Sequence, residues 1–375
     1  MRVFFLRNIF DFLFVIIGTF IGAGFASGKE IYLYFYRYGI IGCLGIFISA
    51  GIMSFVIFKT IKLSIKYKLK NYDLFINKIM DNKNEININN KIKCDKIISN
   101  ENKMNINKKI NNKKINLKLE EIFKTIINIF LIMTFCVMIS GFVGFMSQEF
   151  FINNIFSYFF IIFFLIVSFN KNVNFFMKIN TILIPIIIFS IIYFSCILLI
   201  KIPRLYEFQT IKFNFNKNII FNALIYAGYN LLSIIPIIIP LSNKVNKLKK
   251  IKYIGIIFFI SVISLSILVM FILSYNKFYA KTMEMPIVSI ISCLGIKYKM
   301  LYCCIIGIAI ITSALSVGRG YIDQYSDNER TFRIFILVIS SFICMPIGFS
   351  RLIKYVYPIF GCIGIIQSLF IIRTK

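Results

Sequence analysis

Three short motifs interrupt otherwise apolar stretches of the chain, and each could place oxygen or amide groups around a ligand. The first, residues 18–28 (GTFIGAGFASG), holds four glycines. Each glycine weakens a helix by about 1 kcal/mol relative to alanine. The motif therefore indicates either close packing of helices through small residues or a discontinuous helix. In a discontinuous helix the freed carbonyls bind a cation, and the second half points its N-terminus at an anionic group.

The second motif is residues 226–230 (YAGYN), in which Gly228 is flanked by two tyrosines and an asparagine within an apolar stretch. Polar side chains at membrane depth are costly and usually face a cavity. When the two halves of a chain have interrupted helices at corresponding positions, the pair indicates a transporter site built from two structural repeats. No residue-level repeat links residues 1–200 with residues 218–375, so this symmetry is inferred only from the positions of the two interruptions.

The third motif places Thr312 and Ser313 one helical turn after Ala309 in another apolar stretch. Each hydroxyl can hydrogen-bond back to its own helix, which would give the pair no further role. Alternatively, the two hydroxyls and the Ala309 carbonyl supply oxygen ligands. Such a set has no carboxylate, so it suits a monovalent cation better than Ca²⁺.

The acids and the missing histidines limit the remaining chemistry. The chain has no histidine, which excludes His-dependent zinc, Ser-His and Cys-His catalysis. No acidic residue falls at the centre of a predicted span, which favours Na⁺ coupling or no coupling over a proton relay. Glu30 lies near a span end. It is either an interfacial charge, or it reaches the site and pairs with Lys29 or Arg37. We predict that the protein is not an enzyme.

The elements that position these motifs are apolar helices. The 375-residue chain is 59% apolar and 15% charged, whereas soluble domains are about 45–50% apolar. We therefore predict an all-α integral membrane protein with about ten transmembrane helices. The predicted spans are residues 8–28, 38–58, 123–146, 155–170, 176–200, 219–241, 251–275, 299–318, 331–348 and 352–371. Residues 284–295 are predicted to form a short re-entrant or surface helix.

A hydrophilic insertion at about residues 62–118 interrupts this single transmembrane domain. Sixteen lysines lie between Lys59 and Lys118, and fourteen asparagines lie between Asn71 and Asn116. This composition favours disorder or a weak helix and suggests contact with anionic lipid. Arginines and aromatics are few there, so nucleic-acid binding is not expected despite the net charge of +28.

The lysines of residues 244–252 fall in a short loop and favour a cytoplasmic position for it. With ten spans, both termini are then cytoplasmic. We predict a multi-pass protein of a bacterial cytoplasmic membrane.

The sequence IGAGFASGKEI at residues 21–31 resembles the first-helix signature of the YkvI-like family of bacterial membrane proteins. That family looks like a branch of the amino acid–polyamine–organocation transporter superfamily. The resemblance extends in span order over nearly the whole chain, although Lys29 stands where a glutamine is expected. It implies a five-plus-five inverted repeat with discontinuous helices 1 and 6, the repeats covering about residues 8–200 and 219–371.

By this resemblance, Na⁺ is held by the carbonyls of Gly18, Ile21 and Ala309 and by the hydroxyls of Thr312 and Ser313. A solute carboxylate is received by the amides of Ala23, Gly24 and Phe25, opposite Tyr226, Gly228, Tyr229 and Asn230. The predicted function is Na⁺-coupled secondary transport of an amino-acid-like or other small organic solute by alternating access, without a covalent cofactor. The alternative is a sensor or partner-binding protein with a transporter fold, which the basic insertion suggests.

Overall fold

The computed structural model describes residues 12–69, 71–80, 103–170, 173–201, 218–242 and 248–374, and within these ranges the regular elements are all helical. Eight helices of the described ranges are long and apolar enough to cross a membrane. The shorter apolar helix Asn154–Phe169 and the broken segment of residues 12–34 complete the ten predicted stretches in order. The all-α integral membrane architecture is therefore confirmed.

The helices have the following bounds. They are α2 (Ala23–Ala26), α3 (Lys29–Tyr34), α4 (Ile41–Lys66), α5 (Tyr72–Met80), α6 (Lys103–Phe150), α7 (Asn154–Phe169), α8 (Val173–Lys201), α9 (Asn218–Ser242), α10 (Leu248–Ser274), α11 (Lys277–Thr282), α12 (Pro286–Ser292), α13 (Ile296–Ile322), α14 (Arg330–Cys344) and α15 (Phe349–Arg373). Residues 12–20 are helical before α2. Short 3₁₀ helices cover Tyr36–Tyr38, Asp327–Glu329 and Met345–Ile347.

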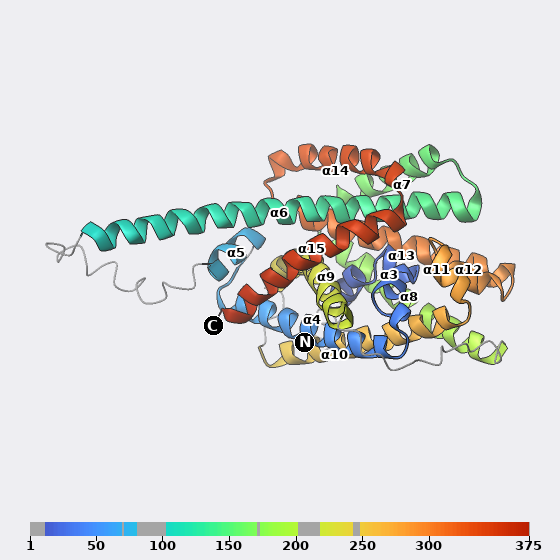
Figure 1. Cartoon of the computed structure of the whole chain (residues 1–375). Coiled ribbons are helices and arrows are strands. Elements are labelled where there is room, and N and C mark those ends of the chain that lie inside the picture. The colour runs from blue at the N-terminus through green and yellow to red at the C-terminus, as the bar shows by residue number, and fades with distance from the viewer. Residues whose placement is uncertain are drawn as a thin grey trace, which may run out of the picture.

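Helix α9 lies inside the bundle and contacts α3, α4, α13 and α15 (Figure 1). Almost all of its residues from Ile225 onwards are buried. Helices α7 and α14 lie at the periphery and expose large aromatic side chains, among them Phe156, Phe159, Phe163, Phe332 and Phe335. An exposed apolar surface of this kind fits contact with the hydrocarbon of a lipid bilayer.

The first span is discontinuous, as predicted. The last regular helical hydrogen bond runs from the Ile21 amide to the Ile17 carbonyl (2.8 Å), and the Gly22 amide then donates to the Phe20 carbonyl (2.9 Å) and not to the Gly18 carbonyl. Regular bonds resume with the Ala26 amide and the Gly22 carbonyl (2.9 Å). A second interruption follows at Gly28, whose φ of 82° is left-handed, a conformation that glycine adopts without a steric penalty. The chain then enters α3.

The sixth span is continuous, so the prediction of a discontinuous helix 6 is wrong. Helix α9 runs unbroken through Gly228. A Cβ atom on Gly228 would lie 2.1 Å from the Gly361 carbonyl oxygen, and one on Gly364 would lie 2.1 Å from the Gly228 carbonyl oxygen. Glycines at these positions let the backbones of α9 and α15 approach closely. The role of Gly228 is thus helix packing.

The predicted insertion is partly incorporated into the bundle. Helix α4 continues to Lys66, and α5 buries Tyr72 and Phe75. The Gln367 amide on α15 donates to the Tyr72 hydroxyl (2.8 Å). Helix α6 begins at Lys103 and is 48 residues long, whereas about 20 residues suffice to span a bilayer. Its N-terminal part accordingly extends beyond the bundle (Figure 1). Residues 81–102 lie outside the described residues.

The short apolar segment at residues 284–295 forms α12, a helix of 7 residues and too short to span. Its Ile287 and Val288 side chains are buried. The Ile287 amide donates to the Ser27 carbonyl (3.1 Å), which joins α12 to the turn between α2 and α3. This short helix therefore packs against one end of the discontinuous first span.

Candidate functional site

The hydroxyl of Ser313 on α13 faces the break in the first span. Its Oγ lies 2.8 Å from the Ile21 carbonyl oxygen, 2.8 Å from the Ala309 carbonyl oxygen and 3.4 Å from the Gly18 carbonyl oxygen. A serine hydroxyl has one proton, so it can donate to only one of these three acceptors. At any moment two of the three carbonyl oxygens therefore receive no proton from Ser313. Such a cluster of neutral oxygens has the ligand chemistry of a site for a hard cation.

The hydroxyl of Thr312 bonds within its own helix. Its Oγ1 lies 3.0 Å from the Ile308 carbonyl and 3.0 Å from the Ala309 carbonyl, both in its own helix. The structure therefore brings Gly18, Ile21, Ala309 and Ser313 together around one point. It relates Thr312 to that point only through the shared Ala309 carbonyl.

The residues predicted to receive a solute carboxylate form α2, and the structure places another carboxylate against them. A Cβ atom on Gly24 would lie 2.1 Å from Oε1 of Glu30. The absence of a side chain at Gly24 is what makes room for this carboxylate. The neighbouring Ala23 amide donates to the Met138 sulfur (3.5 Å), and Phe25 is buried.

Glu30 lies inside the bundle, so of the two alternatives it reaches the site and is not an interfacial charge. It is 3% exposed, and its Oε2 accepts a hydrogen bond from the Tyr229 hydroxyl (2.6 Å). The turn at Gly28 is the cause, because it directs α3 back against α9.

The cations expected to pair with Glu30 bind elsewhere. The Lys29 ammonium donates to the carbonyls of Met283 (2.7 Å) and Lys281 (3.2 Å). The Arg37 guanidinium donates to the Tyr38 hydroxyl (2.9 Å).

Four buried tyrosines group around this carboxylate: Tyr34, Tyr226, Tyr229 and Tyr357. The ring centroids of Tyr229 and Tyr357 are 4.4 Å apart in a stacked arrangement. Tyr226 lies 5.5 Å from Tyr34 and 5.4 Å from Tyr229, again between centroids. Sequence reasoning missed Tyr34 and Tyr357, because neither has a neighbouring signal that distinguishes it from other aromatics of the spans.

The second motif contributes its two tyrosines to this group, but its other members have local roles. The Asn230 amide donates to the Tyr226 carbonyl within α9 (2.9 Å). Gly228 faces α15, as described above. The predicted site residues of α9 thus divide between the aromatic group and the helix contact.

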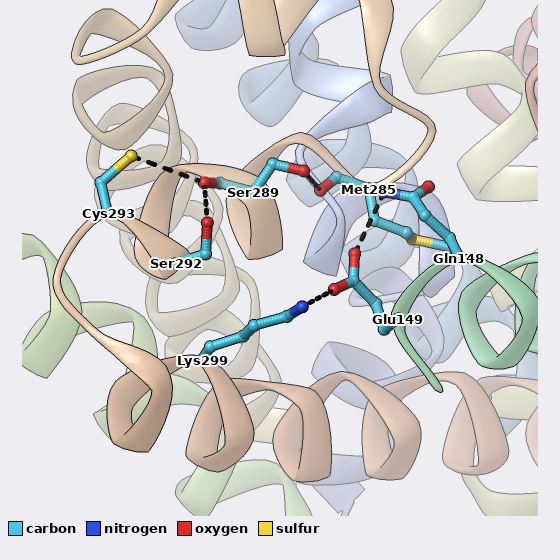
Figure 2. Close-up of polar contacts among 7 residues, drawn as sticks. All are labelled: Gln148, Glu149, Met285, Ser289, Ser292, Cys293 and Lys299. Atoms are coloured by element: carbon cyan, nitrogen blue, oxygen red, sulfur yellow. Dashed lines mark hydrogen bonds and ion pairs between the residues drawn. The ribbon is translucent and has the colours of Figure 1, made fainter. Parts of the chain in front are cut away.

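Polar contacts join the elements where α6 finishes and α13 begins (Figure 2). Lys299 on α13 forms an ion pair with Glu149 on α6 (2.8 Å), and the Gln148 amide donates to the same carboxylate (3.0 Å). Deeper along α13, the Tyr302 hydroxyl donates to the Ala26 carbonyl at the end of α2 (2.7 Å). These contacts hold α6, α13 and the first span together.

A cavity of about 140 Å³ opens near the other end of α13. It lies between α5, α9 and α13, and Tyr72, Pro236, Gly320 and Gln324 are among its lining residues. The ion pair near the start of α13 and the cavity near its end therefore lie at opposite ends of this helix.

Together, the fold and these features define a polytopic α-helical membrane protein. A stretch of 59 residues, 16% of the chain, is 39% identical to the uncharacterized membrane protein YkvI of Bacillus subtilis (strain 168), of which it covers 17%. The similarity thus spans about a sixth of that relative's length. No family model matches the chain.

Proposed function

We propose that this protein is a secondary active transporter that couples the movement of a small organic solute to Na⁺. The observation that carries the proposal is the cluster of backbone carbonyls and the Ser313 hydroxyl at the break in the first span. Irregular backbone within a membrane domain is characteristic of ion and solute sites in transporters. The solute would bind beside this break, between α2 and the tyrosines of α9. The proposal requires no catalytic step.

Two features at opposite ends of α13 support alternating access. The Glu149–Lys299 ion pair joins α6 and α13 at one end, and the cavity beside α9 and α13 lies toward the other. Helices that are five apart in span order also contact one another, as α4 does α10 and α6 does α13. These contacts favour a five-plus-five arrangement in which one group of helices rocks against the other. A bacterial cytoplasmic membrane with both termini inside remains our proposal for location.

Thermal stability of the purified protein in detergent tests the ion site directly. Na⁺ is titrated against K⁺ at fixed ionic strength, and a ligand of the folded state stabilises by RT ln(1 + [Na⁺]/Kd). At ten times Kd this is about 1.4 kcal/mol, which raises the melting temperature by about 2 °C in a chain of this size. We expect the Na⁺-specific rise to disappear in Ser313→Ala and in Ser313→Ala with Thr312→Ala.

Ser316→Ala is the matched control. Its hydroxyl is buried on the same helix but donates to the Thr312 carbonyl (2.8 Å), one turn away from the break. This variant should retain the Na⁺ effect. Equal melting temperatures in Na⁺ and K⁺ for the wild type would refute the coupling ion. Uptake into proteoliposomes with and without a Na⁺ gradient then tests transport itself.

The protruding part of α6 favours a second candidate function, a sensor or partner-binding protein that keeps a transporter fold. Residues 103–120 carry six lysines and extend beyond the bundle (Figure 1). Basic segments at a membrane surface bind anionic lipid headgroups. Replacing residues 81–118 with a Gly/Ser linker, while keeping α5, distinguishes the candidates. If the linker variant keeps uptake but no longer binds anionic vesicles, this segment has a role separate from transport. If the wild-type protein shows no uptake at all, the second candidate function is favoured.

A further inference from the structure

A groove of about 340 Å³ runs between α4 and α10, which lie side by side (Figure 1). Its walls include Phe55 and Ile256, which are 51% and 53% exposed. Apolar surface that two spanning helices expose to this extent faces the hydrocarbon of the bilayer. The groove is therefore separate from the break in the first span and from the buried tyrosines around Glu30.

The two helices touch at one point of the groove and leave space beside it. The Ser54 hydroxyl on α4 donates to the Gly255 carbonyl on α10 (2.6 Å), and a Cβ atom on Gly255 would lie 3.3 Å from Ser54 Oγ. One turn earlier on α4, a Cβ atom on Gly51 would face Phe259, whose Cε2 lies at the ordinary contact distance of 3.9 Å. Because the earlier α4 residue meets the later α10 residue, the helices are antiparallel.

The small size of Gly51 is not explained by packing within the bundle. The residue is helical in α4, where glycine is less favourable than alanine or leucine. Among the described residues, Phe259 alone lies within 4 Å of an added Cβ atom outside that stretch of helix. A hydrocarbon chain bound in the groove does explain the glycine, because it would occupy the space that a side chain would otherwise fill.

Positive charge gathers at one end of the groove. Lys252 lines it in the first turns of α10. Lys62 follows Phe55 by seven residues and Phe58 by four, which places it on the same face of α4 as these two lining residues. Both lysines are exposed, and within the described part of the chain neither forms an ion pair with an acid.

The antiparallel arrangement makes the two lysines converge. In a helix the Cα–Cβ bonds tilt toward the N-terminus, so that of Lys62 tilts back toward the groove and that of Lys252 tilts away from the groove toward Lys62. The lysine-rich loop before α10, which the sequence predicts to be cytoplasmic, lies at the same end. Lysines at the end of an apolar surface reach the headgroup region and attract anionic lipid.

We propose that the groove between α4 and α10 binds an acyl chain of an anionic phospholipid, whose phosphate lies between Lys62 and Lys252. The lining from Gly51 to Phe58 extends about 10 Å along α4, so the groove holds the part of the chain next to the headgroup. A lipid bound there contacts both helices and stabilises the folded protein. This inference goes beyond the proposed transport function and does not depend on it.

Three additives test the inference on the full-length protein in detergent. They are phosphatidylglycerol, phosphatidylcholine with the same acyl chains, and glycerol phosphate, which has the anionic group without the chains. We expect phosphatidylglycerol to raise the melting temperature by about 2 °C at ten times its Kd. Phosphatidylcholine carries its own balancing cation and should cause a smaller rise at the same concentration. Glycerol phosphate should cause none.

Gly51→Leu tests the groove itself, because leucine fills the space and favours the helix. The variant should lose the rise that phosphatidylglycerol causes, while its melting temperature without lipid stays equal to that of the wild type or exceeds it. Cys196→Leu is the matched control, since it adds a similar side chain at an exposed position of α8, outside the groove. That variant should keep the full rise.

Lys252→Gln and Lys62→Gln test the headgroup position. Each should weaken the apparent affinity for phosphatidylglycerol about fivefold, the contribution of one lysine near an anionic lipid. Lys68→Gln removes an exposed charge two residues after the end of α4 and outside the groove lining. This control should bind phosphatidylglycerol as the wild type does.

Each contrary result overturns a different part of the inference. Equal rises with the two phospholipids would reject an anionic lipid, and an equal rise with glycerol phosphate would reject a lipid altogether. A full rise in Gly51→Leu would place binding outside the groove, for example at the lysines of α6. Equal weakening in Lys68→Gln and Lys252→Gln would show diffuse attraction instead of a phosphate site. All of these measurements are made in K⁺, so their outcome is independent of the proposed Na⁺ site.

Discussion

Replacing Gly228 with alanine tests whether this glycine serves the contact between α9 and α15. A Cβ atom here would lie 2.1 Å from the Gly361 carbonyl oxygen and 3.1 Å from the Ile365 amide nitrogen, whereas ordinary contact begins at 3.4 Å. Both neighbours are backbone atoms, so no side-chain rotation can relieve the overlap. Helix α15 must move away from α9, and the packing of both helices is disturbed.

The magnitude follows from two opposing effects. Overpacking a close contact costs about 1–3 kcal/mol. Because Gly228 is helical, alanine recovers up to about 1 kcal/mol of helix propensity. We therefore expect a net loss of up to about 2 kcal/mol, which corresponds to a fall in melting temperature of up to about 3 °C.

The assay is thermal stability in detergent, read as the loss of the monodisperse peak in size-exclusion chromatography after heating. Gly307→Ala is the matched control, because this glycine is also helical but the nearest atom to an added Cβ is Phe145 Cε1 at 4.0 Å. That variant should be as stable as the wild type or slightly more stable. If Gly228→Ala is no less stable than Gly307→Ala, the glycine does not serve a helix crossing and the reasoning fails.

Two further predictions concern contacts near the start of α13 and the start of α3. Glu149→Gln and Lys299→Gln each leave one charge of the ion pair without its partner. The Glu149 side chain is only 5% exposed and that of Lys299 27%, so water replaces the lost partner poorly. Each variant should therefore lower the free energy of unfolding by about 1–3 kcal/mol. The double variant should lose less than the sum, and a double-mutant cycle with no coupling energy would contradict the ion pair. Gly28→Ala should cost about 1–2 kcal/mol for its left-handed backbone and more for overlap with Ile287, 2.8 Å away. A loss of thermal stability no larger than the backbone cost alone would show that the overlap contributes nothing.

Much of the candidate ion site could be predicted from sequence because its parts follow from local rules. The glycines of residues 18–28 weaken one helix at a known place, and the break occurs at Ile21 and Gly22. Once a break faces a hydroxyl-bearing helix, Gly18, Ile21 and Ser313 meet as the resemblance implied. The hydroxyl of Thr312 did not follow, because a threonine in a helix can satisfy itself with its own backbone.

The surroundings of Glu30 could not be predicted, because they depend on long-range packing. A glutamate just after an apolar stretch looks interfacial, and only the turn at Gly28 brings it beside Tyr229, almost 200 residues later in the chain. Tyr357 joins the group because α15 crosses α9 closely. The sequence around Tyr357 contains no signal for this contact.

The sequence by itself determined the class and the element order, because apolar length against the thickness of a bilayer decides which segments cross it. It also determined where the first helix is weak. Only the tertiary structure decided whether Gly228 interrupts α9 or allows α15 to pack closely against it, since that depends on the distance to Gly361. It likewise decided the burial of Glu30. A carboxylate has the same sequence signature at an interface and in a core, and only the groups packed around it distinguish the two.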